Sequence, residues 1–312
     1  MKPRLLQHGR LPEAIEARLA EHYDVHPFWT ETDPASLLAR HGSEFVALTT
    51  RAAIGADATL LAALPSLRVI SSFGVGLDKL DLDTARSRGI AVGYTPDVLN
   101  DCVADTAFAL LMDVSRKISA ADRFVRRGEW PKGQFPLATR VSGKRLGIIG
   151  MGRIGRVIAH RSAGFDMEVR YHSRNRSDDA PYTYEPSLEA LARWADYLVI
   201  ATAGGPSTRH LVSAAVLDAL GPQGFLINIA RGTVVDEAAL VDALVHQRIA
   251  GAGLDVFEDE PHVPEALFEL DNVVLIPHVA SATHETRQAM AELVFENLQA
   301  FFATGAVRKS AI

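Results

Sequence analysis

Two stretches of the sequence combine residue types that could bind a dinucleotide. The first, GIIGMGRIG at 147–155, places Gly150, Gly152 and Gly155 in the spacing G-x-G-x-x-G. In that spacing the first glycine permits a tight turn, the second lets the backbone approach a pyrophosphate, and the third lets a helix pack closely on a strand. Since an apolar stretch precedes the loop and a helical stretch follows it, the context favours a dinucleotide site over a plain turn.

The helix expected after this loop would point free N–H groups at the phosphates. Met151, Arg153 and Ile154 lie on the same loop as the three glycines. A further G-x-G lies in FGVGLDK at 73–79, but it lacks the third glycine and the helix signal. It does not predict a second nucleotide site.

The second stretch, EVRYHSRNRSDD at 168–179, bears on which dinucleotide is bound. A strand in this place usually ends in Asp or Glu, which accepts hydrogen bonds from the ribose hydroxyls of NAD. Here it ends in Ser173 and Arg174, with Arg176 just beyond. A small neutral serine and a guanidinium fork suit a 2′-phosphate, so the pattern predicts NADP(H) in preference to NAD(H). The alternative is that both arginines are solvated charges on a surface loop.

Length and composition narrow the classes of protein. A chain of 312 residues is long for one core and comfortable for two domains. The net charge of −6 gives a nucleic-acid partner no electrostatic support. The single cysteine, Cys102, excludes an internal disulfide and fits a reducing, cytoplasmic compartment, and no apolar run is long enough to predict a membrane span.

Apolar runs alternate with amphipathic segments along most of the chain, which predicts an α/β protein with parallel sheets. A long helix is expected over 101–128, with Asp101 as its N-cap and Gly128 as its stop. A last helix is expected over 284–305, and it could pack back on the first strands. The expected strands cover 44–50, 67–73, 90–94, 145–150, 168–173, 197–202, 224–230, 249–256 and 272–277.

Several motifs in order resemble the D-2-hydroxyacid dehydrogenase family, and closest is its branch of glyoxylate/hydroxypyruvate and hydroxyphenylpyruvate reductases. The resemblance implies two doubly wound, Rossmann-like parallel-sheet domains with the active site in the cleft between them. It implies a substrate-binding domain of 1–97 and 284–312, and a dinucleotide-binding domain of 98–283. The motifs are GVGLDKLDL, TPDVLNDCVADTAFALLM, SGKRLGIIGMGRIG, INIARGTVVDEAAL, AGLDVFEDEP and IPHVASATHETR.

The resemblance assigns the catalytic roles to Arg231, Glu260 and His278. The residue types fit the reduction of a 2-oxo acid. Arg231 would bind the carboxylate and the carbonyl oxygen, and protonated His278 would give a proton to the forming alkoxide. Glu260 would orient the imidazole and favour its charged form. Taken singly, each could instead be an ordinary solvated or turn residue, but three in family order at strand ends favour a site.

The same resemblance implies supporting roles for other residues. Val75 and Gly76 would offer backbone N–H groups to the substrate carboxylate, and Asp255 would contact the nicotinamide carboxamide. Trp130 and Phe135 are expected to pack in a dimer interface, and Gly204–Gly205 departs from the family pattern in a way that could loosen the cofactor lid. The remaining cofactor contacts that the resemblance implies are Met151, Arg153 and Ile154 on the glycine loop, and Thr106, Thr202, Ala203, Ile229 and Ala230.

The leading hypothesis is an NADPH-preferring reductase that converts glyoxylate and hydroxypyruvate to glycolate and D-glycerate. Its expected partners are small 2-oxo and 2-hydroxy acids and a second copy of the chain, without nucleic acid or membrane. One alternative is a reductase of another 2-oxo acid, such as hydroxyphenylpyruvate. Another, from a different class, is a dinucleotide-responsive scaffold like the C-terminal-binding-protein-type corepressors, whose disordered tails this chain lacks.

Overall fold

The computed structural model describes residues 2–312. The chain divides into two compact units. The first comprises the residues up to Leu99 together with Ala282–Ile312, and the second comprises Asn100–Ser281. These limits lie within two residues of the predicted ones.

The first unit is built on a five-stranded sheet in which every strand pair is parallel. The strand order β2-β1-β3-β4-β5 is that of a doubly wound sheet whose order reverses beside β1. The strands are β1 (Arg4–His8), β2 (Asp24–Pro27), β3 (Ala47–Arg51), β4 (Val69–Phe73) and β5 (Ala91–Gly93).

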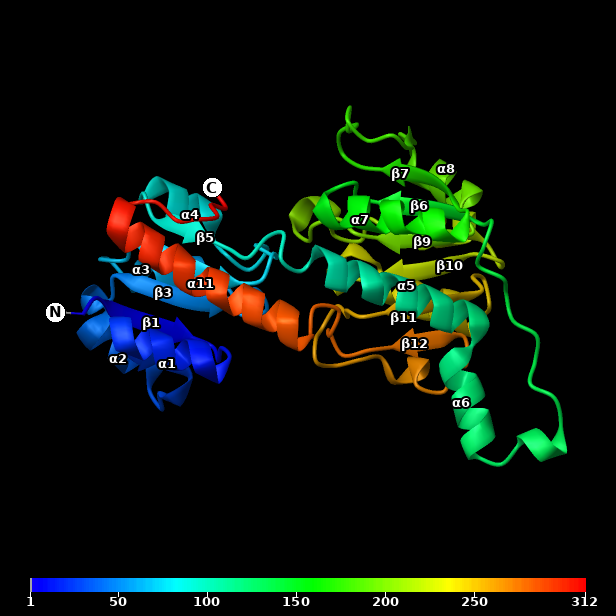
Figure 1. The fold of residues 1–312 in the computed structure, drawn as a ribbon, viewed down its shortest axis with the longest axis horizontal. Coiled ribbons are helices and arrows are strands. Elements are labelled where there is room, and N and C mark those ends of the chain that lie inside the picture. Colours follow the sequence, from blue (N-terminus) through cyan, green and yellow to red (C-terminus); the bar gives the residue numbers. More distant parts are fainter. Residues whose placement is uncertain (1) are drawn as a thin grey trace. The chain divides into compact units, whose positions relative to one another are not determined.

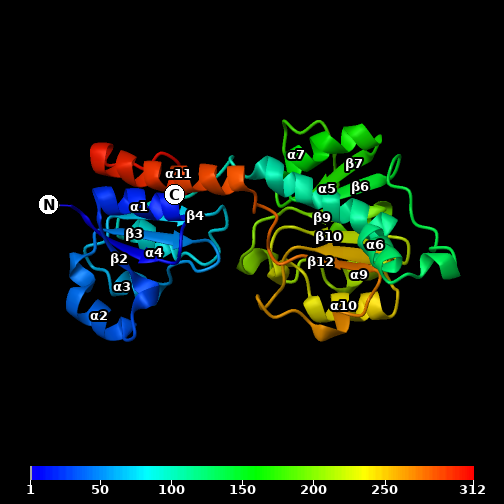
Figure 2. The same cartoon turned by 60° about the horizontal axis from the view of Figure 1, so that its bottom comes forward.

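Helices cover both faces of this sheet, as Figures 1 and 2 show. On one face the last helix packs along β4, where the Ser71 hydroxyl donates to the Val294 carbonyl at 3.0 Å. On the other face, Leu48 and Ile70 meet apolar side chains of two other helices, among them Leu37 and Leu61. The helices of this unit are α1 (Glu13–His22), α2 (Pro34–His41), α3 (Ala58–Ala62), α4 (Leu82–Ser87) and α11 (His284–Thr304).

The second unit contains a seven-stranded sheet in the order β12-β11-β10-β9-β6-β7-β8, again with parallel pairs only. Its central strands β9 and β10 are buried at every residue, as expected for strands covered on both faces. The strands are β6 (Arg145–Ile149), β7 (Glu168–His172), β8 (Thr183–Tyr184), β9 (Tyr197–Ile200), β10 (Phe225–Asn228), β11 (Gly251–Leu254) and β12 (Val273–Leu275).

In this unit two helices, α5 and α7, lie on one face of the sheet, and α8, α9 and α10 lie on the other (Figures 1 and 2). The predicted class, α/β with two Rossmann-like parallel sheets, is therefore confirmed. None of the helices in residues 2–312 has the length and apolar composition needed to cross a bilayer. The helices of this unit are α5 (Asn100–Arg116), α6 (Ile118–Arg126), α7 (Arg153–Ser162), α8 (Leu188–Trp194), α9 (Ala214–Leu220) and α10 (Glu237–Val245).

The helix expected over 101–128 is two helices, so that prediction was wrong in detail. Lys117 adopts a left-handed conformation with φ +54°, and the chain changes direction there. The Asp113 carboxylate accepts a hydrogen bond from the Ser119 N–H at 2.8 Å and so satisfies the start of the second helix. Asp101 is not an N-cap: it lies inside α5, and its carboxylate pairs with Arg161 at 2.9 Å.

Candidate active site

The glycine loop after β6 has the shape that a dinucleotide requires. A side chain on Gly150, whose φ is +99°, would lie 2.8 Å from the backbone of Thr202, and one on Gly155 would collide with the Gly150 carbonyl oxygen. Beside Gly152 there is open space within 4 Å. α7 starts at Arg153 without a side-chain hydrogen bond from its N-cap residue, Gly152, and the start of a helix attracts anions. The open space beside Gly152 at this helix start fits a pyrophosphate.

The loop after β7 carries the residues expected to select the cofactor. The Ser173 hydroxyl donates to the Asn175 carbonyl at 2.6 Å, whereas Arg174 and Arg176 are exposed. Within residues 2–312, neither arginine has a hydrogen-bond or ion-pair partner. Their guanidinium groups therefore stand in water next to the turn that replaces the usual acid.

Sequence reasoning missed Arg156, which lies on α7 and reaches the same loop. Its Nη2 donates to the Ser177 hydroxyl at 2.5 Å and to the Asp179 carboxylate at 2.6 Å. The hydrogen bond from Arg156 lowers the pKa of Asp179. Arg156 is four residues beyond Gly152 in the motif, and only the packing of α7 beside the loop brings it to this place.

The segment after β9, which includes Thr202 and Ala203, forms a closed turn. The Thr208 hydroxyl donates to the Ala203 carbonyl at 2.8 Å, and Gly205 adopts φ +138°, a conformation that L side chains rarely adopt. Gly205 thus permits a turn that the Thr208 hydroxyl closes. The expected effect of Gly204–Gly205 on a cofactor lid stays a prediction.

Arg231 follows β10 and is held by a residue that the sequence analysis did not identify, Asn228. Asn228 is buried, and its side chain bonds both the Ala230 N–H, at 3.1 Å, and the Arg231 carbonyl, at 3.0 Å. The Arg231 guanidinium donates back to the Ala230 carbonyl at 2.7 Å. Ile229 and Ala230 are themselves buried, so the backbone that carries the arginine is fixed.

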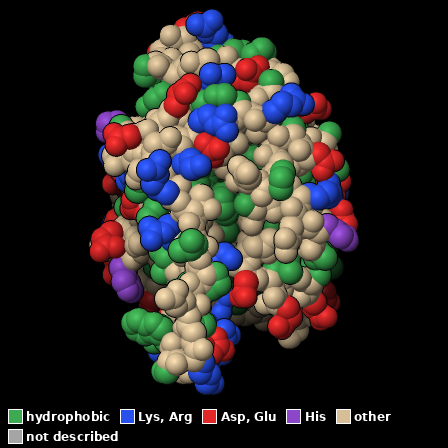
Figure 3. Space-filling model, turned by 90° about the vertical axis from the view of Figure 1, so that its right-hand side faces the viewer, with side chains coloured by type: hydrophobic (Ala, Val, Ile, Leu, Met, Phe, Trp, Pro, Cys, Tyr) green, Lys and Arg blue, Asp and Glu red, His purple; other side chains and the backbone are tan. Residues whose placement is uncertain are grey.

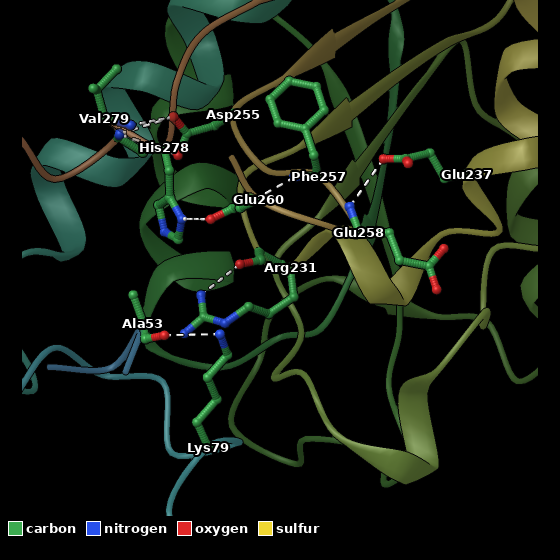
Figure 4. A network of polar contacts seen from close by, with 12 residues as sticks. Ala53, Lys79, Arg231, Glu237, Asp255, Phe257, Glu258, Glu260, His278 and Val279 are labelled. Atoms are coloured by element: carbon green, nitrogen blue, oxygen red, sulfur yellow. Dashed lines mark hydrogen bonds and ion pairs between the residues drawn. The ribbon is translucent and has the colours of Figure 1, made fainter. Parts of the chain in front are cut away.

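Glu260 and His278 form a pair at a distance of 2.7 Å between Oε2 and Nδ1 (Figure 4). Burial alone would raise the pKa of Glu260, but the hydrogen bond and charge of His278, the Phe257 N–H and the charge of Arg231 outweigh it, so the pKa is lowered. An ionised carboxylate beside Nδ1 requires a proton on that nitrogen. Nε2 is then the ring nitrogen left to exchange a proton with a ligand.

Asp255, at the end of β11, holds the backbone around His278. Its carboxylate is almost fully buried and accepts the Val279 N–H at 2.6 Å and the Ala280 N–H at 3.2 Å (Figure 4). Burial raises the pKa of Asp255, although these N–H groups act against the rise. His278 has φ +51°, uncommon for a residue other than glycine, and these bonds keep it there. The expected contact of Asp255 with a carboxamide stays a prediction.

Three further predicted residues have clear local surroundings. The Thr106 hydroxyl donates to the Cys102 and Ala280 carbonyls, both at 3.2 Å, so it supports the chain just after His278. In the first unit, Val75 and Gly76 form the turn after β4, and no acceptor for their N–H groups is found in the described part of the chain. Whether they bind a carboxylate stays a prediction.

The predicted residues of the second unit gather at one edge of its sheet. Gly150, Thr202, Arg231, Asp255 and His278 each follow the carboxyl end of a different strand. In an open α/β sheet this edge is where ligands bind. Across residues 2–312, no group of three or more His, Cys, Asp or Glu side chains could hold a metal ion. The edge therefore offers a cation, an imidazole–carboxylate pair and a glycine loop to an organic ligand.

Comparison with known proteins agrees with this arrangement. Residues 108–280 match the family model described as D-isomer specific 2-hydroxyacid dehydrogenase, NAD binding domain. A glyoxylate/hydroxypyruvate reductase A of Arabidopsis thaliana is 48% identical over 289 residues, which are 93% of this chain and 92% of that protein. The hydroxyphenylpyruvate reductase of Plectranthus scutellarioides is 49% identical over the same shares of the two chains.

A solved structure is similar over the whole length. The NADPH-dependent glyoxylate/hydroxypyruvate reductase from Sinorhizobium meliloti, in complex with NADP and malonate, has a TM-score of 0.91 and 41% identity, covering 100% of this chain and 97% of that one. Relatives of this kind are named as reductases and dehydrogenases of 2-hydroxy acids, so the chain is an oxidoreductase. It belongs to the D-isomer specific 2-hydroxyacid dehydrogenase family.

Proposed function

We propose that the protein is an NADPH-preferring reductase of small 2-oxo acids, glyoxylate and hydroxypyruvate above all. The observation that carries the proposal is the hydrogen-bonded pair of Glu260 and His278. Arg231 and His278 both follow carboxyl ends of strands in the same sheet. An imidazole held by an ionised carboxylate suits proton transfer to a carbonyl oxygen. A guanidinium suits the carboxylate that every 2-oxo acid carries.

In the proposed mechanism, Arg231 binds the substrate carboxylate and stabilises negative charge on the carbonyl oxygen. The loop of Gly150, Gly152 and Gly155 would hold the dinucleotide, which when bound would supply the hydride for the carbonyl carbon. His278 gives the proton from Nε2 to that oxygen, so the carbonyl becomes a hydroxyl, and Glu260 stabilises the imidazolium before the transfer. Asp255 and Asn228 act through other residues, because they fix the backbones of His278 and Arg231.

The preference for NADPH rests on the loop after β7. Arg174 and Arg176 are exposed beside Ser173, and Arg156 reaches the same loop from α7. Arg156 is paired with Asp179, so among the described residues the free cations of the loop are Arg174 and Arg176. Two exposed guanidinium groups without an acidic residue at the strand end suit a 2′-phosphate and offer the ribose of NAD no carboxylate. The relative from Sinorhizobium meliloti is named as NADPH-dependent, which supports the same choice.

The experiment compares kcat/KM for glyoxylate, hydroxypyruvate and hydroxyphenylpyruvate with NADPH and with NADH. We expect turnover of the two small acids and a preference for NADPH of roughly tenfold or more, as one charged contact to a phosphate can supply. Equal use of both cofactors would refute the cofactor proposal. Faster turnover of hydroxyphenylpyruvate would identify an aromatic 2-oxo acid as the substrate. No turnover of any of the three acids would favour a dinucleotide-responsive scaffold instead.

We also propose that the protein is a cytoplasmic homodimer that pairs through α6 and the segment after it. Apolar side chains project there into solvent: Val125 is 53% exposed, Trp130 67% and Leu137 99%. Figure 3 views the molecule from the right-hand side of Figure 1, and hydrophobic side chains lie at the lower end of that face, among charges of both signs. Exposed apolar side chains grouped in this way mark protein interfaces. Light scattering should give twice the chain mass, and Trp130→Ala with Leu137→Ser should give a monomer.

A further inference from the structure

The turn that carries Glu260, residues 257–260, is fastened by a side chain outside the predicted site. Glu237, the first residue of α10, accepts a hydrogen bond from the Glu258 N–H at 3.0 Å (Figure 4). In the same turn the Phe257 N–H donates to Glu260 at 3.1 Å. The neighbouring N–H groups of Phe257 and Glu258 thus donate to two different carboxylates, those of Glu260 and Glu237.

The other contacts of the turn do not replace the hydrogen bond between Glu237 and the Glu258 N–H. Gly232 packs so closely on the Phe257 backbone that any side chain there would collide with it, which limits movement of the start of the turn. The Glu258 carboxylate points to a different segment, where it pairs with Arg209 at 2.6 Å and His210 at 3.0 Å. Glu237 is therefore the side chain that ties the backbone of the turn to α10.

Glu237 is not needed to cap its own helix. The Asp236 side chain already accepts the Ala239 N–H at 3.1 Å as the N-cap. Glu237 is also half-buried, and burial raises its pKa, so keeping a carboxylate here has an energetic cost. Burying a carboxylate costs free energy, and the contact that Glu237 makes with the turn is its hydrogen bond to the Glu258 N–H. We take this cost as a sign that the position of the turn is important.

We propose that Glu237 is a positioning residue for the reaction: through the Glu258 N–H it fixes the turn that sets Glu260 against His278. The inference rests on the proposed reductase function. A shift of the turn would lengthen the 2.7 Å contact between Glu260 and His278. Loss of orientation at a catalytic group lowers turnover more than it lowers substrate binding.

The test separates the reach of this side chain from its charge. Glu237→Asp keeps the charge but shortens the side chain, while Glu237→Gln keeps the length and an acceptor oxygen but loses the charge. We expect Glu237→Asp and Glu237→Ala to lower kcat about tenfold, with KM, the NADPH dissociation constant and Tm nearly unchanged, and Glu237→Gln to stay within about twofold of wild type. Glu189→Ala is the control, since Glu189 is an exposed carboxylate in the first turn of α8.

Hydrogen exchange gives a readout that does not depend on turnover. The Glu258 amide should exchange about tenfold faster in Glu237→Asp than in wild type, and at the wild-type rate in Glu237→Gln. Wild-type kcat and exchange in Glu237→Asp would overturn the inference, as would a Gln variant as impaired as the Ala variant. If the wild type reduces no 2-oxo acid, the proposed function fails, and the exchange rates alone decide the role of Glu237 in the turn.

Discussion

The residues around His278, here called the corner (Asp255, Glu260 and His278 with Arg231), and the loop after β7 present charged groups to a ligand in opposite ways. At the corner, Glu260 is bonded to the imidazole and to the Phe257 N–H, and Asp255 fixes the neighbouring backbone. In the loop, Arg174 and Arg176 project into water. The corner holds its geometry before any ligand arrives, whereas the loop can take its geometry from the ligand.

This difference fits the two tasks that we propose for these regions, proton transfer at His278 and selection of the cofactor by the loop. Proton transfer and charge stabilisation depend on distance and orientation, so a prearranged corner avoids reorganisation during the reaction. Selection between two dinucleotides needs an attraction to one phosphate, which flexible guanidinium groups can supply at an exposed site. Mutations at the corner should therefore affect turnover, and mutations in the loop should affect cofactor choice.

The largest effect should come from His278→Gln at the corner. Without a proton donor, kcat for glyoxylate should fall by about 10²- to 10⁴-fold, the range typical of general acid–base catalysis. Steady-state assays with NADPH measure it, and fluorescence titration should give an unchanged cofactor affinity. A drop below tenfold would mean that another group donates the proton.

Arg231→Lys should have the next largest effect. Lysine keeps the charge but loses the planar fork that a carboxylate matches, so kcat/KM should fall about ten- to a hundredfold. The same substitution at Arg193, an exposed arginine on α8, is the matched control. If KM for glyoxylate is unchanged in Arg231→Lys, the substrate carboxylate is bound elsewhere.

In the loop, Arg174→Ala should remove most of the discrimination between the cofactors. The ratio of kcat/KM for NADPH to that for NADH should fall roughly tenfold, while kcat with saturating cofactor changes little. Arg193→Ala serves as the control. A large fall in kcat itself would contradict the separation of the two regions.

The smallest effect concerns stability in acid. The pKa of Glu260 is lower in the folded protein than its ordinary value, so its contribution to stability is complete above that value and is lost as the pH falls through the lowered pKa. Below pH 5 the unfolding free energy of wild type should fall with acid, and in Glu260→Gln it should fall less. The difference should be about 1 kcal/mol or less, as for a partly exposed pair. Urea unfolding across this range measures it, with the exposed Glu269→Gln as the control.

Periodicity and motifs predicted the fold well where the signal was long. The apolar run before Gly150 and those leading to Arg231 and His278 are strands, because central strands of a parallel sheet are apolar throughout. The short edge strand β8, Thr183–Tyr184, gave no such pattern. The break at Lys117 gave no signal either, because the chain has neither Gly nor Pro there.

The candidate site was predictable where a motif names a residue and obscure where packing creates a contact. Residue types alone gave the glycine loop and the missing acid at Ser173. The supports of the site came only with the structure: Asn228 beneath Arg231, Arg156 beside the loop and Glu237 behind the turn. Each of these side chains acts across a distance in the chain or through a backbone group, and single-sequence patterns carry little information about such contacts.

The placement of α11 has a consequence for the order in which the chain is built. The first unit is complete only with its C-terminal residues: Val294 accepts from Ser71, and the buried Asn297 donates to the Tyr94 carbonyl at 3.1 Å. The strands of this unit are synthesised before the second unit, yet one face of β4 stays uncovered until α11 has been synthesised. The second unit is a single uninterrupted stretch that can fold during translation, while the strands before it remain without their covering helix until α11 follows.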